Sequence, residues 1–383
     1  MASLTDFIRE RFVPVQPLPP ALYHYRSGPD EQHPYRLHLR LEKDGSGILV
    51  INAATVLHLN PTAAEFALHL IEQTSPEQAA RQVASRYRIN RAMALMDFNA
   101  FSERIHTLID TPDLDPTTYL DFERVQSHSQ QLVAPLRLDC ALTYRLPSGS
   151  QVEYAPTRRV DRELTTQEWA TILDKAWAAG IPHVTFTGGE ATLRDDLAEL
   201  VAHAEKNGQV CGLLSDGLKV ADSSYLQSLL KAGLDHLLFL LQPQNEASWK
   251  ALEVIMPEDL FTTVHLTVTQ QVLAAGMDIL SRLAGLGVKS LSLSYADAAL
   301  HDDTRHLQDR AAALGLTLRW DLPVPYSAQN PVAHEAIEDD APSGAGKAWL
   351  YVEPDGDVLP AQGLADQVLG NFLKDPWEKI HKD

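Results

Sequence analysis

The chain has 383 residues, of which 45% are hydrophobic and 22% charged, a composition that supplies buried cores and is not that of a disordered chain. At about 100–200 residues per domain, this length predicts two or three domains. The formal net charge of −19 argues against nucleic acid and anionic membranes as partners and favours neutral or basic ones.

Cysteine is scarce, since Cys140 and Cys211 are the two in the chain. They are too few for a disulfide framework or a four-thiolate metal site, and each lies in an apolar run, where a free cysteine acts as a small buried hydrophobe. Apolar runs long enough to cross a membrane are absent, and residues 1–11 lack the apolar centre of a signal peptide. We therefore expect a cytoplasmic protein with no membrane span.

The N-terminal third predicts a small mixed unit. Residues 1–34 are rich in proline and predict an irregular arm. Short apolar and β-branched runs over residues 35–59, broken by an Asp-Gly turn, predict a three-stranded meander. Helices are expected at 61–73, 76–88 and 91–110, the first capped by Asn60 with proline at its first position. Residues 35–112 therefore predict one domain, followed by a linker over 113–134.

From residue 135 the pattern alternates strand and helix. Expected strands are 136–144, 183–187, 210–214, 236–241, 262–269, 290–295 and 316–320, and glycines 180, 208, 233, 287 and 315 each end a helix just before a strand. Parallel strands joined by right-handed crossovers follow from this repeat. Residues 135–326 therefore predict a partial or full (β/α) barrel, in which chemistry occurs at the carboxyl ends of the strands.

The remaining residues, 327–383, predict a loop, a hairpin with an Asp-Gly turn and a closing helix near 376–382.

The clearest candidate site follows the second barrel strand. Gly188 and Gly189 at a strand end would let a ligand approach the backbone closely, and Glu190 could bind an ammonium group. The alternative is a tight turn with a solvated glutamate.

These residues resemble a known family. Gly188-Gly189-Glu190 is similar to the Gly-Gly-Glu-Pro motif that holds the aminoacyl part of S-adenosylmethionine in radical SAM enzymes. Ser215-Asp216-Gly217-Leu218 resembles the Thr-Asn-Gly-Leu segment that follows the third barrel strand of that family. The resemblance implies a pocket like that for S-adenosylmethionine, formed by Gly188, Gly189, Glu190, Ser215 and Asp216.

Two further modules extend the resemblance. The run 354–361, Pro-Asp-Gly-Asp-Val-Leu-Pro-Ala, is similar to a SPASM extension, the auxiliary-cluster region of peptide-modifying radical SAM enzymes. The run 56–64, Val-Leu-His-Leu-Asn-Pro-Thr-Ala-Ala, resembles a PqqD-like domain, a RiPP recognition element. The fold class expected is therefore α/β: a radical-SAM-like partial (β/α) barrel with an N-terminal α+β PqqD-like, winged-helix-type domain and a C-terminal degenerate SPASM-like extension.

The family's cluster cysteines have no counterparts here. Its spacing places them at Leu146, Ser150, Glu153, Ser343 and Ala361. An iron–sulfur cluster needs thiolate ligands, so we expect no cluster, no bound metal, greatly weakened binding of S-adenosylmethionine and no catalytic residues. On this interpretation the chain is a radical SAM pseudoenzyme rather than an enzyme.

The PqqD-like unit implies a peptide partner. Such domains bind the leader of a ribosomally made precursor peptide by adding it as a strand to their sheet. The expected binding residues are Thr55, Val56, Leu57, His58 and Leu59 at the edge, with Phe98, Phe101 and Ile105 on the flanking helix. The alternative is that the unit is a packed appendage.

Three hypotheses for function follow. The first is a catalytically degenerate scaffold that binds a precursor peptide, or pairs with a cysteine-complete radical SAM maturase, in a ribosomal peptide natural product pathway. The second is an enzyme with repurposed, cluster-free chemistry, using Glu153, Glu190, Asp216 and Asp321. The third is a sensor of S-adenosylmethionine or another small molecule.

Weaker candidates have plain structural alternatives. The run 301–306, His-Asp-Asp-Thr-Arg-His, suggests metal ligands but fits a solvated helix start. Asp195 and Asp196 fit a helix N-terminus, and residues 320–326 could line a barrel mouth or simply pack.

Overall fold

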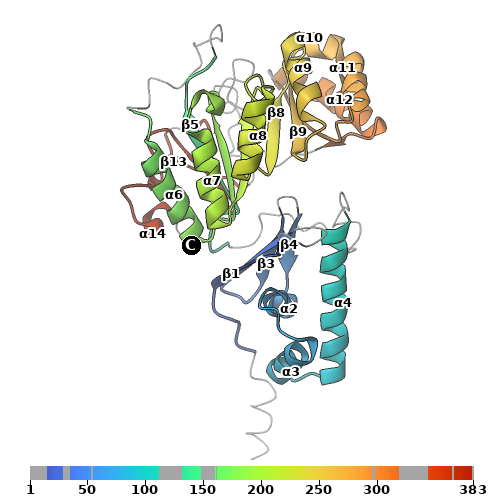
Figure 1. The fold of residues 1–383 in the computed structure, drawn as a ribbon, viewed down its shortest axis with the longest axis vertical. Helices are drawn as coiled ribbons and strands as arrows, with labels where there is room; N and C mark the ends of the chain where they lie inside the picture. The colour runs from blue at the N-terminus through green and yellow to red at the C-terminus, as the bar shows by residue number, and fades with distance from the viewer. Residues whose placement is uncertain are drawn as a thin grey trace, which may run out of the picture. The chain divides into compact units, whose positions relative to one another are not determined.

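The computed structural model describes residues 15–28, 35–52, 55–111, 132–147, 160, 162–295, 298–318, 344–364 and 366–381, without the side chains of 298 and 301. The chain divides into two compact units, Met1–Val133 and Ala134–Asp383 (Figure 1). Each unit is described by itself.

The first unit contains a four-stranded antiparallel sheet in the order β1-β2-β3-β4. Its strands are β1 (Ala21–Arg26), β2 (Arg36–Leu41), β3 (Gly47–Ile51) and β4 (Thr55–Leu59). The predicted meander over 35–59 is confirmed, and its turn is closed by Gly45 at a φ of +85°. The structure differs in β1, which lies within the segment expected to be irregular. Surrounding prolines hid this strand, and its place at the sheet edge is where nearby prolines are tolerated.

Helix α2 (Pro61–Ile71) and the second half of α4 (Arg91–Asp110) cover one face of this sheet, and α3 (Pro76–Tyr87) packs on α2 and α4. Asn60 caps α2 as predicted, because its side chain accepts a hydrogen bond from the Ala63 amide at 2.9 Å. Alternate residues of β2 and β3 pack against α2 and against the second half of α4, which forms the core of the unit.

The second unit is built on a ten-stranded mixed sheet in the order β11-β10-β9-β8-β7-β6-β5-β12-β13-β14. The strands from β5 to β11 run parallel and are β5 (Arg137–Thr143), β6 (His183–Gly188), β7 (Val210–Ser215), β8 (His236–Leu240), β9 (Phe261–Val268), β10 (Ser290–Tyr295) and β11 (Thr317–Leu318). The tail adds β12 (Trp349–Val352), parallel to β5, then β13 (Asp357–Leu359) and β14 (Gly370–Asn371), both antiparallel. The α/β class is therefore confirmed, with a sheet that stays open among the described strands.

The connecting helices are α6 (Thr166–Ala179), α7 (Leu197–Asn207), α8 (Ser223–Ala232), α9 (Glu246–Ile255), α10 (Gln270–Ala274), α11 (Gly276–Gly285) and α12 (His301–Ala313), with α14 (Trp377–Ile380) near the end. The predicted glycine stops are confirmed, since Gly180, Gly208 and Gly233 are left-handed caps. The helix predicted over 271–286 is instead broken into α10 and α11 at Gly276, where a Cβ would lie 2.6 Å from a methyl carbon of Leu307 on α12. This close helix packing explains the break.

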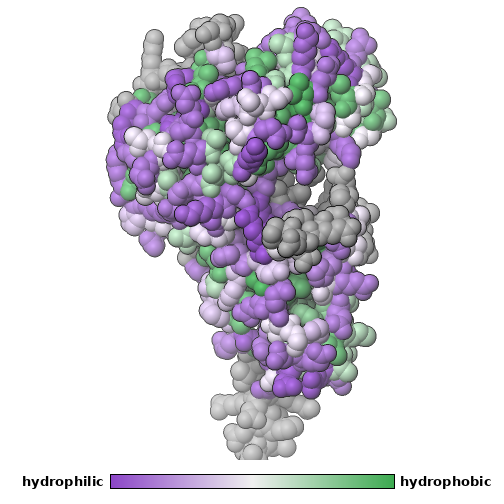
Figure 2. Space-filling model, in the orientation of Figure 1, coloured by the Kyte–Doolittle hydropathy of each residue, from purple (hydrophilic) through white to green (hydrophobic). Residues whose placement is uncertain are grey.

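The two faces of the large sheet differ in chemistry. One face is apolar and packs against α6–α12 in a single core, with Phe186 and Phe239 among its strand residues. On β6, β9 and β10 the opposite face carries buried threonine, serine and histidine side chains, including Thr187 and His265. We call this second surface the inner face. The visible outside of the helical layer is mostly hydrophilic (Figure 2).

Among the described residues, no helix is both long and apolar enough to cross a membrane.

Candidate functional site

The carboxyl ends of β6 and β7 bring together the residues of the predicted S-adenosylmethionine-like pocket. The Ser215 hydroxyl donates to Oε1 of Glu190 at 2.8 Å, and the Asp216 amide donates to Oε2 of Glu190 at 2.9 Å. Parallel strand ends are where open α/β sheets bind ligands.

The Glu190 carboxylate also organises its own loop. It accepts hydrogen bonds from the Thr192 amide at 3.0 Å and from the Thr192 hydroxyl at 2.6 Å, and Glu190 is only 3% exposed. It is therefore a buried, fully hydrogen-bonded group, so the solvated-glutamate alternative is wrong. Burial raises the pKa of Glu190 to about 7, with the nearby charge of Asp216 as the second cause.

Asp216 is the second acidic group of the site. Its Oδ1 accepts from the Leu218 amide at 2.9 Å, and burial raises its pKa above the ordinary value. Two buried carboxylates this close favour a shared proton or a cation between them. An ammonium group is one cation of suitable chemistry.

Gly188 and Gly189 leave no room for a side chain, for a reason that the sequence did not reveal. Gly188 has a φ of +135°, and a Cβ on it would lie 2.0 Å from the Thr143 carbonyl oxygen. A Cβ on Gly189 would lie 2.1 Å from the Arg145 carbonyl oxygen. The close approach is therefore made by the end of β5, and the Gly189 and Glu190 amides donate to those same two carbonyls at 2.7 and 2.8 Å.

A lysine and a tyrosine flank the site and were missed by sequence reasoning. Lys219 Nζ donates to the Thr192 carbonyl at 2.6 Å and lies 4.7 Å from the centre of the Tyr225 ring. The Tyr225 hydroxyl is buried and has no hydrogen-bond partner among the described residues, and burial raises the pKa of Tyr225, helped by the charge of Glu190. The position of Lys219, three residues after Asp216, was the available signal.

The end of β5 leads into the first group of positions that the family's spacing assigned to cluster cysteines. There Arg145 forms an ion pair with Glu163 at 3.0 Å, and the Thr143 hydroxyl donates to the same carboxylate. Leu146 packs on a small apolar cluster of Ala141, Tyr144, Tyr351 and Leu359. Ser150 and Glu153 lie outside the described residues.

The C-terminal tail holds the other two positions that the family's spacing assigned to cluster cysteines. Ala361 is buried, and Ser343 lies outside the described residues. The predicted Asp-Gly turn is present, with Gly356 at a φ of +92° and Asn371 Nδ2 donating to Asp357 Oδ1 at 2.8 Å.

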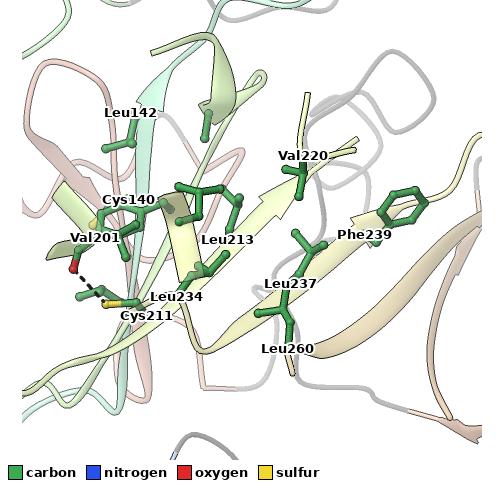
Figure 3. Close-up of a cluster of buried hydrophobic side chains, with 14 of the residues drawn as sticks. Cys140, Leu142, Val201, Cys211, Leu213, Val220, Leu234, Leu237, Phe239 and Leu260 are labelled. Carbon is green, nitrogen blue, oxygen red and sulfur yellow. Dashed lines mark hydrogen bonds between the residues drawn. The ribbon is translucent and has the colours of Figure 1, made fainter. Parts of the chain in front are cut away.

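Both cysteines are core residues, as predicted. Cys140 on β5 and Cys211 on β7 are 0% exposed and point into the apolar cluster of leucines, Val201 and Phe239 (Figure 3). The Cys211 thiol donates to the Val201 carbonyl at 3.7 Å, and burial raises the pKa of Cys140 well above its ordinary value. They are therefore neutral thiols of the core.

The residues predicted to bind a peptide divide into two groups. Strand β4 is an edge of its sheet, and Val56 on it is 37% exposed. Phe98 and Ile105 of α4 are buried in cores of the first unit, and Phe101 is partly buried against the same cores. Among the described strands β4 pairs on one side only, with β3, whereas Phe98 and Ile105 stabilise the unit.

The structure adds no support for a functional role of the weaker candidate residues. No group of histidine, cysteine and carboxylate side chains suited to a metal occurs among the described residues. Asp196 pairs with Arg194 at 2.6 Å, and Asp195 lies 4.0 Å from Lys219 Nζ. The segment 320–326 lies outside the described residues.

Comparison with known proteins identifies the class. Residues 140–256 match the radical SAM superfamily, so the second unit carries a radical SAM domain.

The curated relatives are peptide-modifying enzymes by name. The chain is 27% identical over 280 residues to a PqqA peptide cyclase of Streptomyces rochei, covering 64% of this chain and 75% of the relative. It is 25% identical over 258 residues to a PqqA peptide cyclase of Gluconobacter oxydans, covering 59% of this chain and 70% of the relative. The chain is therefore homologous to PqqA peptide cyclases.

Solved structures show the same fold. SuiB of Streptococcus suis bound to S-adenosylmethionine superposes with a TM-score of 0.61 at 15% identity, covering 94% of this chain and 88% of that one. SuiB bound to its precursor peptide SuiA gives 0.61 at 14% identity, covering 90% and 87%.

These findings correct three predictions. The degenerate scaffold and the pseudoenzyme are wrong, because the homologues are named for catalysis as PqqA peptide cyclases. The expectation of no cofactor is also wrong, because a radical SAM domain implies an iron–sulfur cluster and S-adenosylmethionine. The error came from inferring the loss of activity from the absence of cysteine at the five positions that the family's spacing assigns to cluster ligands.

The chain's own thiols nevertheless do not fit a cluster. A site with three thiolates needs more than the two cysteines of this sequence, and both lie buried against the helices on the apolar face. We therefore assign no cluster ligand and derive no reaction step through a cluster.

Proposed function

We propose that the protein is an enzyme that binds S-adenosylmethionine at the joined ends of β6 and β7 and modifies a peptide. The observation that carries the proposal is the homology to PqqA peptide cyclases, which covers 64% of the chain, and the radical SAM match over residues 140–256 agrees with it. The buried Glu190–Ser215–Asp216 junction supports it, because a pre-formed acidic site suits the ammonium group of an aminoacyl ligand.

Each group of this site has a binding or positioning role in the proposal. The Glu190 carboxylate fixes the Thr192 loop and the start of the Asp216 loop, so that backbone atoms of both face one ligand. Asp216 supplies the negative charge nearest to solvent, since it is the more exposed of the two carboxyl groups. Lys219 holds the Thr192 carbonyl and borders the site with a positive charge.

Titration calorimetry with S-adenosylmethionine tests the site. We expect Asp216→Asn to weaken binding by about tenfold or more, because removal of a charged hydrogen-bond partner costs about 1.5–3 kcal/mol. Glu199→Gln is the matched control, since this exposed carboxylate of α7 loses the same charge away from the site. Absence of binding by the unaltered protein at millimolar ligand would reject the site.

Mass spectrometry tests the reaction. The protein is incubated with S-adenosylmethionine and the PqqA peptide, the peptide named for the curated relatives. A change in peptide mass that depends on both protein and S-adenosylmethionine supports the proposal. Binding of both ligands without any change in mass argues against an enzyme acting on this peptide.

We also propose that residues 35–112 are a PqqD-like domain that binds a peptide leader at the edge of β4, and that residues 327–383 are a degenerate SPASM-like tail. The place of β4 at the end of the described sheet, with Val56 exposed, supports the first part, since an added strand pairs with the backbone of an edge strand. Hydrogen exchange with the PqqA peptide should protect amides of residues 55–59. The opposite edge, β1, is the internal control, and protection there instead would contradict the proposal.

A further inference from the structure

The inner face of the large sheet carries a hydroxyl and imidazole ladder on β9 and β10. His265 and Ser292 are register partners on the two parallel strands, and Ser294 lies two residues further along β10. His265 Nδ1 is 3.0 Å from Ser292 Oγ, and Nε2 is 3.0 Å from Ser294 Oγ. Both ring nitrogens of one buried histidine are therefore held by hydroxyls of the neighbouring strand.

The burial of this ladder decides its charge. His265 is 3% exposed, and burial lowers its pKa to about 3. A neutral imidazole has one N–H donor and one acceptor nitrogen. The two serines must therefore play opposite roles towards the ring.

The burial of Ser292 decides which group donates the hydrogen bond between Ser292 and His265. Ser292 is 7% exposed, and His265 Nδ1 is its side chain's sole hydrogen-bond partner in the described structure. If Nδ1 carried the proton, the Ser292 hydroxyl would be a buried donor with no acceptor among the described residues, at a cost of about 1–3 kcal/mol. Ser292 therefore donates to Nδ1, and the proton of the ring is on Nε2.

The proton on Nε2 determines the role of the Ser294 hydroxyl. Nε2–H donates to Ser294 Oγ, so the Ser294 hydroxyl proton points elsewhere. Ser294 is only partly buried and precedes the last residue of β10, at the ligand-binding edge of the sheet. The next pair along the sheet, Thr263 and Ser290, is joined at 2.9 Å, and both residues are only 4% exposed, so the hydroxyl proton that this pair leaves over is buried.

We propose that His265 is a positioning residue that holds the Ser294 hydroxyl as a hydrogen-bond donor to a carbonyl oxygen of the peptide substrate. The proposal depends on the proposed function for the presence of a peptide substrate. The direction of the hydrogen bonds from Ser292 to His265 and from His265 to Ser294, which we call the relay, is independent of the proposed function.

The direction of the relay is tested without any ligand. The protein is labelled with 15N-histidine, and His265→Gln assigns the His265 signals among the 15 histidines. Long-range proton–nitrogen spectra between pH 6 and 8 should show a neutral ring with the proton on Nε2. A ring protonated on Nδ1, or a charged ring, would overturn the relay.

The substrate contact is tested with the PqqA peptide by calorimetry in the presence of S-adenosylmethionine. Ser294→Ala should weaken peptide binding about 3- to 10-fold, as expected for one neutral hydrogen bond, and Ser294→Thr should restore it. Ser290→Ala is the matched control, because it removes a hydroxyl from the same face of the same strand at a more deeply buried position. Equal affinity of the Ser294→Ala variant would overturn the contact.

A double variant separates positioning from general damage. His265→Gln combined with Ser294→Ala should bind the peptide no more weakly than Ser294→Ala alone, because both remove the same donor. Additive losses would overturn the positioning role. If the unaltered protein binds no peptide, both the proposed function and the contact between Ser294 and the peptide are wrong. The proton–nitrogen spectra still test the direction of the relay in that case.

Discussion

The Ser215 hydroxyl donates to the Glu190 carboxylate at 2.8 Å and so joins the carboxyl ends of two neighbouring strands. Glu190 lies 25 positions earlier in the chain, at the end of β6. With the amides of Thr192 and Asp216 on the same carboxylate, one buried side chain organises two loops. The stability of this junction should therefore depend on the charge of Glu190.

Stability should fall as pH rises through the titration of Glu190. The folded pKa, about 7, is raised above the ordinary 4.5, so the folded state holds its proton more tightly than the unfolded state. The contribution is complete below pH 4.5 and is lost as pH rises towards 7, by up to roughly 3 kcal/mol. Urea unfolding at pH 5 and pH 7.5 measures it.

The matched variant for that experiment is Glu190→Gln. An uncharged amide removes the titration, so the difference in unfolding free energy between the two pH values should shrink. The absolute stability should also fall, because the amide nitrogen faces the Asp216 amide donor. An unchanged pH slope in this variant would show that another group titrates.

A side chain at Gly189 should break the junction of β5 and β6. In Gly189→Ala the new Cβ would lie 2.1 Å from the Arg145 carbonyl oxygen, which backbone cannot relieve without losing the Glu190 amide bond. We expect a loss of several kcal/mol, typical of overpacking, measured by urea unfolding. Gly285→Ala in α11 is the control, because its Cβ meets nothing within 4 Å and should be neutral or slightly stabilising.

Local sequence rules predicted most of the helices and strands because each rule acts over a few residues. The Asn60 cap and the glycine caps at 180, 208 and 233 could be predicted for this reason. Strand β1 and the break at Gly276 were not, because both depend on packing between segments far apart in the chain. The order in which strands pair in the sheet also depends on such packing, except where the simple βα repeat predicts it.

The site divides in the same way. Gly188, Gly189, Glu190 and Asp216 were found because strand ends can be read from the chain. The His265–Ser292–Ser294 ladder was missed, since the two strands that form it are 27 residues apart and alternation alone gives only a polar face. The assignment of an inactive protein failed for a different reason: missing cysteines bear on the cluster alone, whereas the homologues of the chain are named as PqqA peptide cyclases.

Both thiols should be unreactive in the folded protein. Cys140 and Cys211 are 0% exposed, and burial raises the pKa of Cys140, which suppresses the reactive thiolate. A thiol reagent such as Ellman's should label neither residue in native buffer within an hour and both in 6 M guanidinium, by the general rule that access requires unfolding. Fast native labelling of one thiol would mean that the core at β5 or β7 opens locally.

Lys175 should hold the C-terminal tail against α6. Its Nζ donates to the Phe372 carbonyl at 2.7 Å and to the Asp375 carbonyl, and it lies 5.7 Å from the centre of the Phe372 ring. Lys175→Met keeps much of the aliphatic stem but leaves both carbonyls without this donor, at a cost of about 1–3 kcal/mol. Hydrogen exchange should therefore accelerate over residues 370–380 while β6 stays protected. Lys231→Met, an exposed lysine in the last turn of α8, is the control and should leave tail exchange unchanged. Equal tail exchange in both variants would show that the apolar contacts of Phe372 and Trp377 are sufficient to dock the tail.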